Sequence, residues 1–170
     1  MAGKSKAGAG ARPAAGVNLL EGNPAAGKAR VAVVVSRFNS AVTDHLLAGA
    51  TAALVRRGVK PGDITVAKVP GAVEIPIAAK RLAATKRYAA VVALGCVIRG
   101  DTTHYDYVCS MAADGVSDAA LSTGVPVIFG VLTTENLEQA LERAEVARGD
   151  KGGEAALAAL EMADLLRRIK

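Results

Sequence analysis

The sequence predicts an α/β fold in which a parallel β-sheet lies between two layers of helices. Short apolar runs rich in Val, Ile and Leu alternate with longer segments of helical periodicity, which is the order of repeated βα units. The apolar runs are continuous, as is typical of strands that helices cover on both faces. Right-handed crossovers between such units give one parallel sheet with helices on both sides.

The basic character of the chain is concentrated at its start. Residues 1–16 are low-complexity Ala, Gly and Lys, where we expect a disordered basic tail before a single domain over 17–170. Residues 1–30 hold five Lys and Arg against one Glu, so they carry +4 of the formal charge of +5. The rest of the chain carries almost no net charge, and the whole chain has only five aromatic residues on which bases could stack. We therefore do not expect it to bind nucleic acid. No apolar run approaches the ~18 residues of a membrane span, so we expect a cytoplasmic protein without membrane contact.

The first predicted elements are two strands and a helix. The short run 17–22 (VNLLEG) ends in Gly-Asn-Pro and indicates a short strand, and the run 30–36 (RVAVVVS) indicates a central one. An apolar stripe over 41–57 predicts a helix, with Ser40 as its N-cap and Gly58 closing it.

Two further βα units follow. The run 64–69 predicts a strand that breaks at a Pro-Gly pair, and the helix expected over 73–85 tolerates Pro76 only in its first turn. The run 88–98 is long and rich in Val, Ile and Leu, so we expect a buried strand there, followed by a helix over 103–123.

The last unit has a shorter strand and two helices. We expect a strand over 126–130 (PVIFG), then a helix that Thr134 caps and that runs to about residue 147. Gly149 breaks this pattern before a final helix over 152–169.

Ligands of such sheets bind at the carboxyl ends of the strands. Here these ends carry SRFN, VPGAVE, IRGDTTH and FG, so we expect a composite site. Both phenylalanines of the chain, Phe38 and Phe129, fall at these ends, which a flat ligand would explain; the alternative is that each closes the core at a strand end. Glu74 follows a Pro-Gly turn, where a carboxylate also suits a helix start without any function.

The segment after the 88–98 strand has the residues of an anion site. Asp101, Thr102 and Thr103 stand at a helix start, whose free amides bind anions. His104 lies in the first turn, where the helix dipole favours a neutral imidazole that can accept a proton. The alternative is that the threonines only cap the helix and that His104 is a surface side chain.

Several other classes of site are not supported. Cys96 and Cys109 lie thirteen positions apart without a CxxC or a His/Cys cluster, so we expect buried apolar side chains rather than metal ligands. The motifs GxGxxG and GxxxxGK[ST] are absent, and the first buried strand ends in Ser36 and Arg37, not in the acidic residues that a phospho-acceptor domain needs.

Six fragments in order, SRFN, VPGAVEIP, ALGCVIRGDTTHYDYVC, VIFGVLTTEN, QALERA and GDKGGEAA, resemble those of lumazine synthases of riboflavin biosynthesis. The resemblance covers residues 19–169. It implies a flavodoxin-like three-layer α/β/α fold with a four-stranded parallel sheet plus a short N-terminal strand. It also implies a transferase that condenses 5-amino-6-ribitylamino-2,4-pyrimidinedione with 3,4-dihydroxy-2-butanone 4-phosphate, without cofactor or metal.

The resemblance assigns roles residue by residue, with His104 as the proton shuttle. The pyrimidine or its ribityl chain would contact Phe38, Asn39, Gly71, Ala72, Val73, Glu74, Val97, Ile98 and Lys151. The butanone phosphate would contact Gly100, Asp101, Thr102, Thr103 and Arg143. In the family, residues matching Phe129, Arg143 and Lys151 complete the pocket of a neighbouring subunit.

The resemblance therefore implies a homo-oligomer, at least a pentamer, and an association with riboflavin synthase. The short connection from Arg143 to Lys151 favours a 60-subunit icosahedral shell. Three residues depart from the common family pattern: Val73 replaces an aromatic residue, Asp101 puts a carboxylate beside the phosphate, and Asp150 replaces an asparagine. The alternative function is a non-catalytic flavin-binding or shell-forming protein on the same scaffold.

Overall fold

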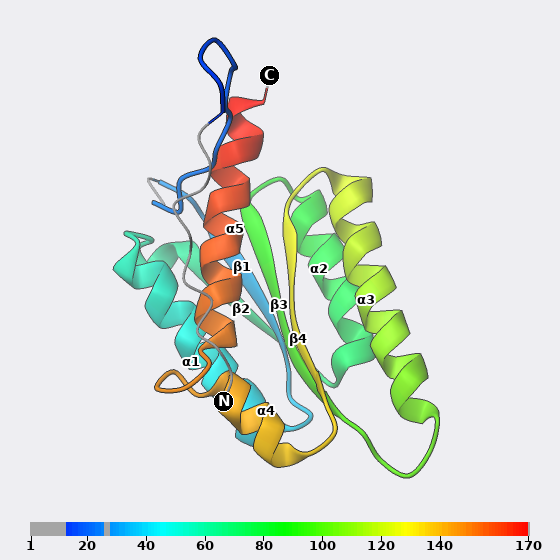
Figure 1. Cartoon of the computed structure of the whole chain (residues 1–170). Coiled ribbons are helices and arrows are strands. Elements are labelled where there is room, and N and C mark those ends of the chain that lie inside the picture. Colours follow the sequence, from blue (N-terminus) through cyan, green and yellow to red (C-terminus); the bar gives the residue numbers. More distant parts are fainter. Residues whose placement is uncertain (1–12, 26–27, 170) are drawn as a thin grey trace.

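The sheet has four parallel strands and lies between two layers of helices, as predicted (Figure 1). The computed structural model describes residues 13–25 and 28–169, so most of the predicted basic tail, residues 1–12, lies outside the described residues. The strand order is β2-β1-β3-β4, with the crossover point between β1 and β3. The strands are β1 (Val31–Ser36), β2 (Ile64–Val69), β3 (Ala90–Ile98) and β4 (Val127–Thr134).

At the carboxyl end of the sheet, β3 extends beyond the last residue of β1 that pairs with it. The pairing of β1 with β3 runs from Val31 opposite Ala90 to Val35 opposite Leu94. On its other side β3 stays paired with β4 as far as Ile98. The end of β3 therefore projects beyond β1, and this step in the sheet edge forms the base of the site described below.

One face of the sheet is covered by α1 (Ser40–Arg56), α4 (Leu137–Ala144) and α5 (Lys151–Arg168) (Figure 1). The α1–α5 contact depends on glycine, because a Cβ atom at Gly152 would lie 2.0 Å from the carbonyl oxygen of Leu46. Buried alanines on both helices continue this close approach.

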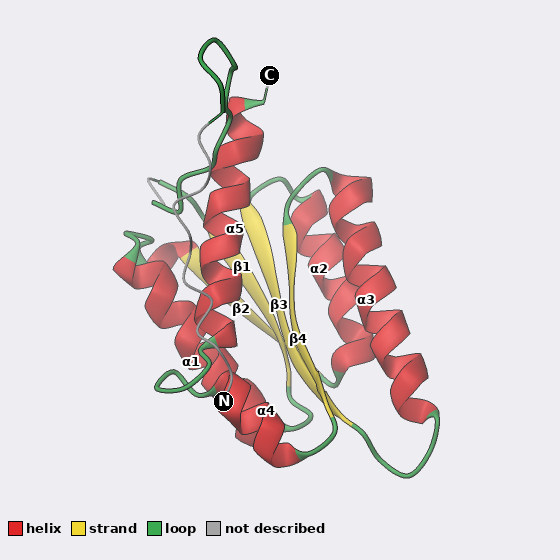
Figure 2. Ribbon diagram, in the orientation of Figure 1, coloured by secondary structure: helices red, strands yellow, loops and turns green. Residues whose placement is uncertain are grey.

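The other face is covered by α2 (Ile75–Ala84) and α3 (His104–Thr123), as the red helices of Figure 2 show. A 3-10 turn, η2 (Ala72–Glu74), precedes α2, and another, η1 (Pro61–Asp63), precedes β2. Pro76 lies in the first turn of α2, as predicted, and packs against Gly115 of α3.

The predicted short strand over 17–22 is not confirmed, since within the single chain these residues form no strand. Val17, Leu19 and Leu20 are exposed, and only the end of the segment contacts a helix. A Cβ atom at Gly22 would lie 2.1 Å from the carbonyl oxygen of Glu161, and the backbone N–H of Asn23 donates to Asp164 at 2.9 Å, both on α5.

Several element boundaries also differ from the prediction. The N-cap of α1 is Asn39, in a left-handed conformation, and not Ser40. The last strand continues through Thr134 because 131–134 pair with β3, so the cap of α4 is Asn136, whose side chain accepts from Gln139 N at 2.9 Å. The helix α4 then ends at Ala144.

Among the described residues no helix has the length and apolar character that crossing a membrane requires.

Candidate functional site

A cavity of about 560 Å³ lies at the carboxyl ends of β1, β2 and β3, beside the step in the sheet edge. It brings together most of the residues that the sequence singled out on three separate strand ends. Its lining is formed by Phe38, Asn39, Gly71, Ala72, Val73, Glu74, Cys96, Val97, Ile98, Gly100, Thr102, His104, Tyr105 and Val108.

The end of β1 supplies Phe38 and Asn39. The backbone of Phe38 donates to the carbonyl of Pro70 at 3.0 Å, and the residue, which is 69% exposed, lines the cavity. Asn39 has φ 58° and ψ 44°, a left-handed conformation that asparagine tolerates better than most residues. Its Nδ2 atom donates to the carbonyl of Cys96 at 3.0 Å, so this side chain takes the place of a strand partner beyond the end of β1.

The backbone of Ile98 has no strand partner on the β1 side of β3. The carbonyl of Cys96 points to the β1 side, where Asn39 binds it, whereas the N–H of Arg99 points to the β4 side and donates to Thr134 at 2.9 Å. Because successive residues of a strand alternate in the side to which their backbone groups point, the N–H and C=O of Ile98 point to the β1 side. They lie beyond the last β1 partner and are therefore available to a ligand.

The turn after β2 holds Glu74 at the cavity. Its Oε2 atom accepts a hydrogen bond of 2.9 Å from the N–H of Gly71, as in a capping box. This bond fixes the carboxylate beside the turn, and Oε1 forms no hydrogen bond with the described residues. One carboxylate oxygen is thus left for an incoming donor.

The loop 100–103 leads from β3 to His104 at the start of α3. The Oγ1 atom of Thr102 accepts from the N–H of His104 at a long 3.4 Å, and Thr103 is the N-cap without a side-chain bond. Asp101 forms no hydrogen bond or ion pair with the described residues, so its carboxylate does not occupy the amides of this helix start. His104 is exposed and lines the cavity.

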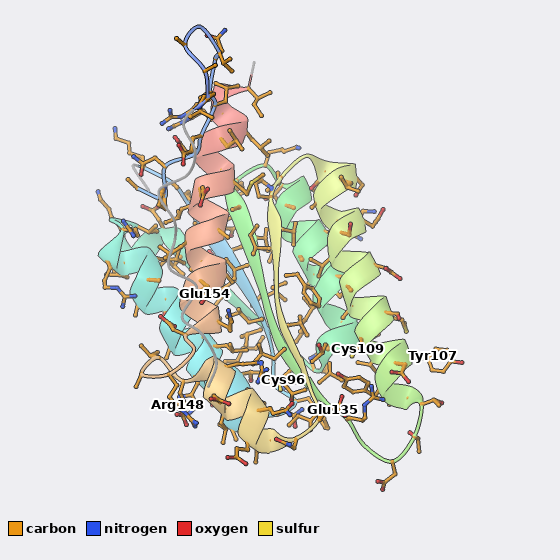
Figure 3. All side chains as sticks on the ribbon, viewed as in Figure 1. Cys96, Tyr107, Cys109, Glu135, Arg148 and Glu154 are labelled. Carbon is orange, nitrogen blue, oxygen red and sulfur yellow. The ribbon has the colours of Figure 1, made fainter. Side chains whose placement is uncertain are left out.

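Sequence reasoning missed Tyr105 and Arg99. The ring of Tyr105 lines the cavity and lies under the guanidinium of Arg99, whose carbon is 4.0 Å from the ring centre. Arg99 also pairs with Glu135, which lies near the carboxyl ends of the strands, at the bottom of Figure 3. Their positions beside Gly100 and His104 are a signal in the sequence, but the stacking depends on the path of the loop.

Phe129 and Lys151 lie apart from this cavity. Both line a second cavity of about 280 Å³ between β4 and α5, where Lys151 pairs with Glu154 at 2.5 Å. Arg143 lies on α4, and its side chain donates to the carbonyl of Gln139 at 3.0 Å. Within one chain these three residues do not line the first cavity.

The two cysteines do not form a reactive or metal-binding pair. Burial raises the pKa of the Cys96 thiol to about 11, and burial also raises the pKa of Cys109. Both thiols are therefore protonated near neutral pH. In the described part of the chain no three His, Cys, Asp or Glu side chains converge as metal ligands.

The arrangement can bind a flat ring against an aromatic side chain, read a ring edge by backbone groups, and hold an anion at a helix start beside a histidine. The chain also matches a known protein family. The family model described as 6,7-dimethyl-8-ribityllumazine synthase matches residues 28–167.

Proposed function

Because the chain belongs to the 6,7-dimethyl-8-ribityllumazine synthase family, we propose that it catalyses the penultimate step of riboflavin biosynthesis. In this reaction 5-amino-6-ribitylamino-2,4-pyrimidinedione condenses with 3,4-dihydroxy-2-butanone 4-phosphate. The products are 6,7-dimethyl-8-ribityllumazine, phosphate and water. The observation that carries the proposal is the family match over residues 28–167, which includes every residue of the candidate site.

The pyrimidine is proposed to bind over the step in the sheet edge. Phe38 would stack on its ring, and the N–H and C=O of Ile98 would pair with the ring edge. The backbone groups of Val97 point to the β4 side by the same alternation, so Val97 would contact the ligand only as part of the cavity lining. Asn39 keeps its Oδ1 atom for the ligand while Nδ2 holds Cys96. The free oxygen of Glu74 would accept hydrogen bonds from ribityl hydroxyls. The exposed ring and the unpaired end of β3 support this placement.

The phosphate of the second substrate is proposed to bind at the loop 100–103. Backbone amides at a helix start and the hydroxyls of Thr102 and Thr103 suit a phosphate, and the helix dipole adds to its stabilisation. Asp101 leaves these amides free, which supports the assignment despite its charge. Arg143 would supply the cation, because its planar guanidinium can bind two phosphate oxygens at once.

His104 is proposed to move the protons of the reaction. The amine attacks the ketone and loses water to form an imine, phosphate leaves with loss of a carbon-bound proton, and ring closure removes a second water. Nearly every step transfers a proton, and an imidazole can act as both base and acid near neutral pH. The position of His104 directly after the loop 100–103 supports this role, because that loop is proposed to hold the phosphate of the reacting substrate.

The active form is proposed to be a homo-oligomer, at least a pentamer and in full a 60-subunit shell, in the cytoplasm and in association with riboflavin synthase. Phe129, Arg143 and Lys151 lie away from the first cavity of their own chain, which supports their delivery to a neighbouring chain. Apolar side chains exposed on the single chain also support burial between subunits; they include Val55, Ile77, Met111 and Leu121.

The direct test mixes the purified protein with both substrates and measures lumazine formation by fluorescence, with particle mass from light scattering in the same sample. We expect product and a particle of pentamer mass or larger. A large particle that binds riboflavin but forms no lumazine would instead support the non-catalytic alternative.

A further inference from the structure

Arg99 follows β3 directly and joins three elements beside the first cavity. Its Nε atom lies 2.9 Å from Oε2 of Glu135, which follows β4, and its Nη1 atom lies 3.4 Å from Oδ1 of Asp106 in the first turn of α3. Its guanidinium carbon lies 4.0 Å from the centre of the Tyr105 ring. The Arg99 side chain is therefore held by two carboxylates and one aromatic face.

These contacts bridge the two ends of the loop 100–103. Arg99 stands at the start of the loop, and its partners Tyr105 and Asp106 stand beyond its end, in α3. The side chains inside the loop hold it weakly, since its best side-chain contact is the 3.4 Å bond between Thr102 and the N–H of His104. A short polar loop that begins with glycine has a large conformational entropy, so an external bridge has a large effect on its order.

Tyr105 connects this bridge to the cavity. It lines the cavity, and it is the neighbour of His104 in the same helical turn. The contact that holds Tyr105 therefore acts on the same helical turn that carries His104. Burial raises the pKa of the Tyr105 phenol, so the ring under Arg99 stays uncharged at neutral pH.

We propose that Arg99 is a positioning residue that fixes the loop 100–103 and His104 by stacking on Tyr105 and pairing with Asp106. The inference rests on the proposed function, because it assigns the loop to the phosphate substrate. Arginine suits this role because a planar guanidinium stacks on a ring while its edge binds carboxylates. The compact ammonium group of a lysine cannot make both contacts in this geometry.

The test is the steady-state kinetics of lumazine formation by Arg99→Ala and Arg99→Lys. We expect Arg99→Ala to lower kcat/KM by roughly 10-fold to 100-fold, because misplacement of a substrate or base by about 1 Å has effects of this size. KM for the phosphate substrate should rise and kcat should fall. KM for the pyrimidine should change little, since Phe38 and Glu74 lie on other strand ends. Arg99→Lys should also lose activity; full activity in Arg99→Lys would contradict the stacking role.

Arg30 offers a matched control at the opposite end of the sheet. Its guanidinium carbon lies 6.0 Å from the ring centre of Tyr88, and its Nε atom lies 3.8 Å from Asp63. Arg30→Ala thus removes the same side chain and the same kinds of contact away from the loop. We expect its kinetics to stay close to those of the wild type, because Arg30 precedes β1 at the end of the sheet opposite to the cavity. Equal kinetics for Arg99→Ala and Arg30→Ala would overturn the inference.

If Arg99→Ala does not fold, Tyr105→Phe and Tyr105→Leu decide the question. Phenylalanine keeps a ring for the guanidinium, whereas leucine does not. We expect Tyr105→Phe to keep most of the wild-type kcat/KM and Tyr105→Leu to lose roughly 10-fold or more. Equal values for these two variants would contradict the proposal.

Binding of inorganic phosphate, measured by calorimetry, separates this inference from the proposed function. We expect the affinity to be several-fold weaker in Arg99→Ala than in the wild type and in Arg30→Ala. If the wild type forms no lumazine while this difference persists, the proposed function fails and the loop-positioning role stands. If the wild type forms lumazine and Arg99→Ala matches it in both measurements, the positioning role fails alone.

Discussion

The side-chain amide of Asn39 donates a 3.0 Å hydrogen bond to the backbone carbonyl of Cys96, across 57 residues of sequence. The bond closes the gap where β1 has ended and β3 continues, so it ties the end of β1 to the part of β3 that lines the cavity. A residue that was expected to bind only the ligand therefore also holds the frame of the site.

The first prediction concerns the stability of this junction. Asn39→Ala should lower the free energy of unfolding by about 2 kcal/mol or more, since it loses the hydrogen bond and places alanine in a left-handed conformation. Asn39→Gly loses the bond without the backbone strain, so its loss should be smaller by about 1 kcal/mol. Urea unfolding at one fixed protein concentration measures both values. Equal losses of unfolding free energy in the two variants would mean that the left-handed conformation at position 39 does not affect stability.

The second prediction concerns proton transfer. His104→Ala should lower kcat by roughly 10²-fold and leave the assembly intact, because the side chain is exposed at the cavity and supports no core contact. The remaining rate comes from the orientation of the two substrates. Stopped-flow fluorescence gives the rate, and light scattering gives the particle mass. An unchanged kcat would remove His104 from the mechanism.

The third prediction concerns the phosphate cation. Arg143→Ala should raise KM for the butanone phosphate about 10-fold or more, as for the loss of charged hydrogen bonds, while KM for the pyrimidine changes little. Arg148→Ala is the matched control, since Arg148 lies in the next connection and pairs at 3.8 Å with Glu142 and with Glu145. If only the pyrimidine KM rises in Arg143→Ala, the assignment of Arg143 to the phosphate is wrong.

The order of strands and helices could be predicted because local patterns encode it. The run at β1 is buried at every position, and the breaks at Gly58, Pro70 and Gly100 stand where elements end. The strand ends then determine which residues meet in the cavity. What depends on distant partners could not be predicted: the side chain of Asn39 binds the carbonyl of Cys96, and Gly22 packs against Glu161 of α5. Arg99 belongs to this group as well, because its contacts depend on the path of the loop.

The fourth prediction concerns Asp150, the departure from the family pattern beside Lys151. Asp150 has φ 42°, and its side chain caps α5 by accepting from the N–H of Gly153 at 3.1 Å. Asparagine can adopt this backbone conformation and accept the same hydrogen bond, so Asp150→Asn should change the free energy of unfolding by less than about 0.5 kcal/mol. Asp150→Ala should lower it by about 2 kcal/mol through loss of the cap and strain of the backbone. Thermal unfolding at one protein concentration compares the two variants with the wild type. An Asp150→Ala variant as stable as the wild type would contradict the capping role.

The fifth prediction concerns acid stability at Asp164, a buried carboxylate on α5. Its pKa is lowered from the ordinary value of 3.8, first by the hydrogen bond from the N–H of Asn23 and further by Arg167 and Arg168. Above pH 3.8 the carboxylate is ionised in both folded and unfolded chains, so its stabilisation is fully present there. As the pH falls below 3.8 toward the lower pKa of the folded chain, the unfolded chain takes up the proton first and this stabilisation is lost.

Asp164→Asn keeps an oxygen for Asn23 but not the charge, so its urea midpoint should be lower than that of the wild type at pH 7 and closer to it at pH 3. Asp118→Asn, which removes an exposed carboxylate paired with Lys80, should show little of this dependence. A difference between Asp164→Asn and wild type that stays constant from pH 7 to pH 3 would show that the charge of Asp164 does not stabilise the fold.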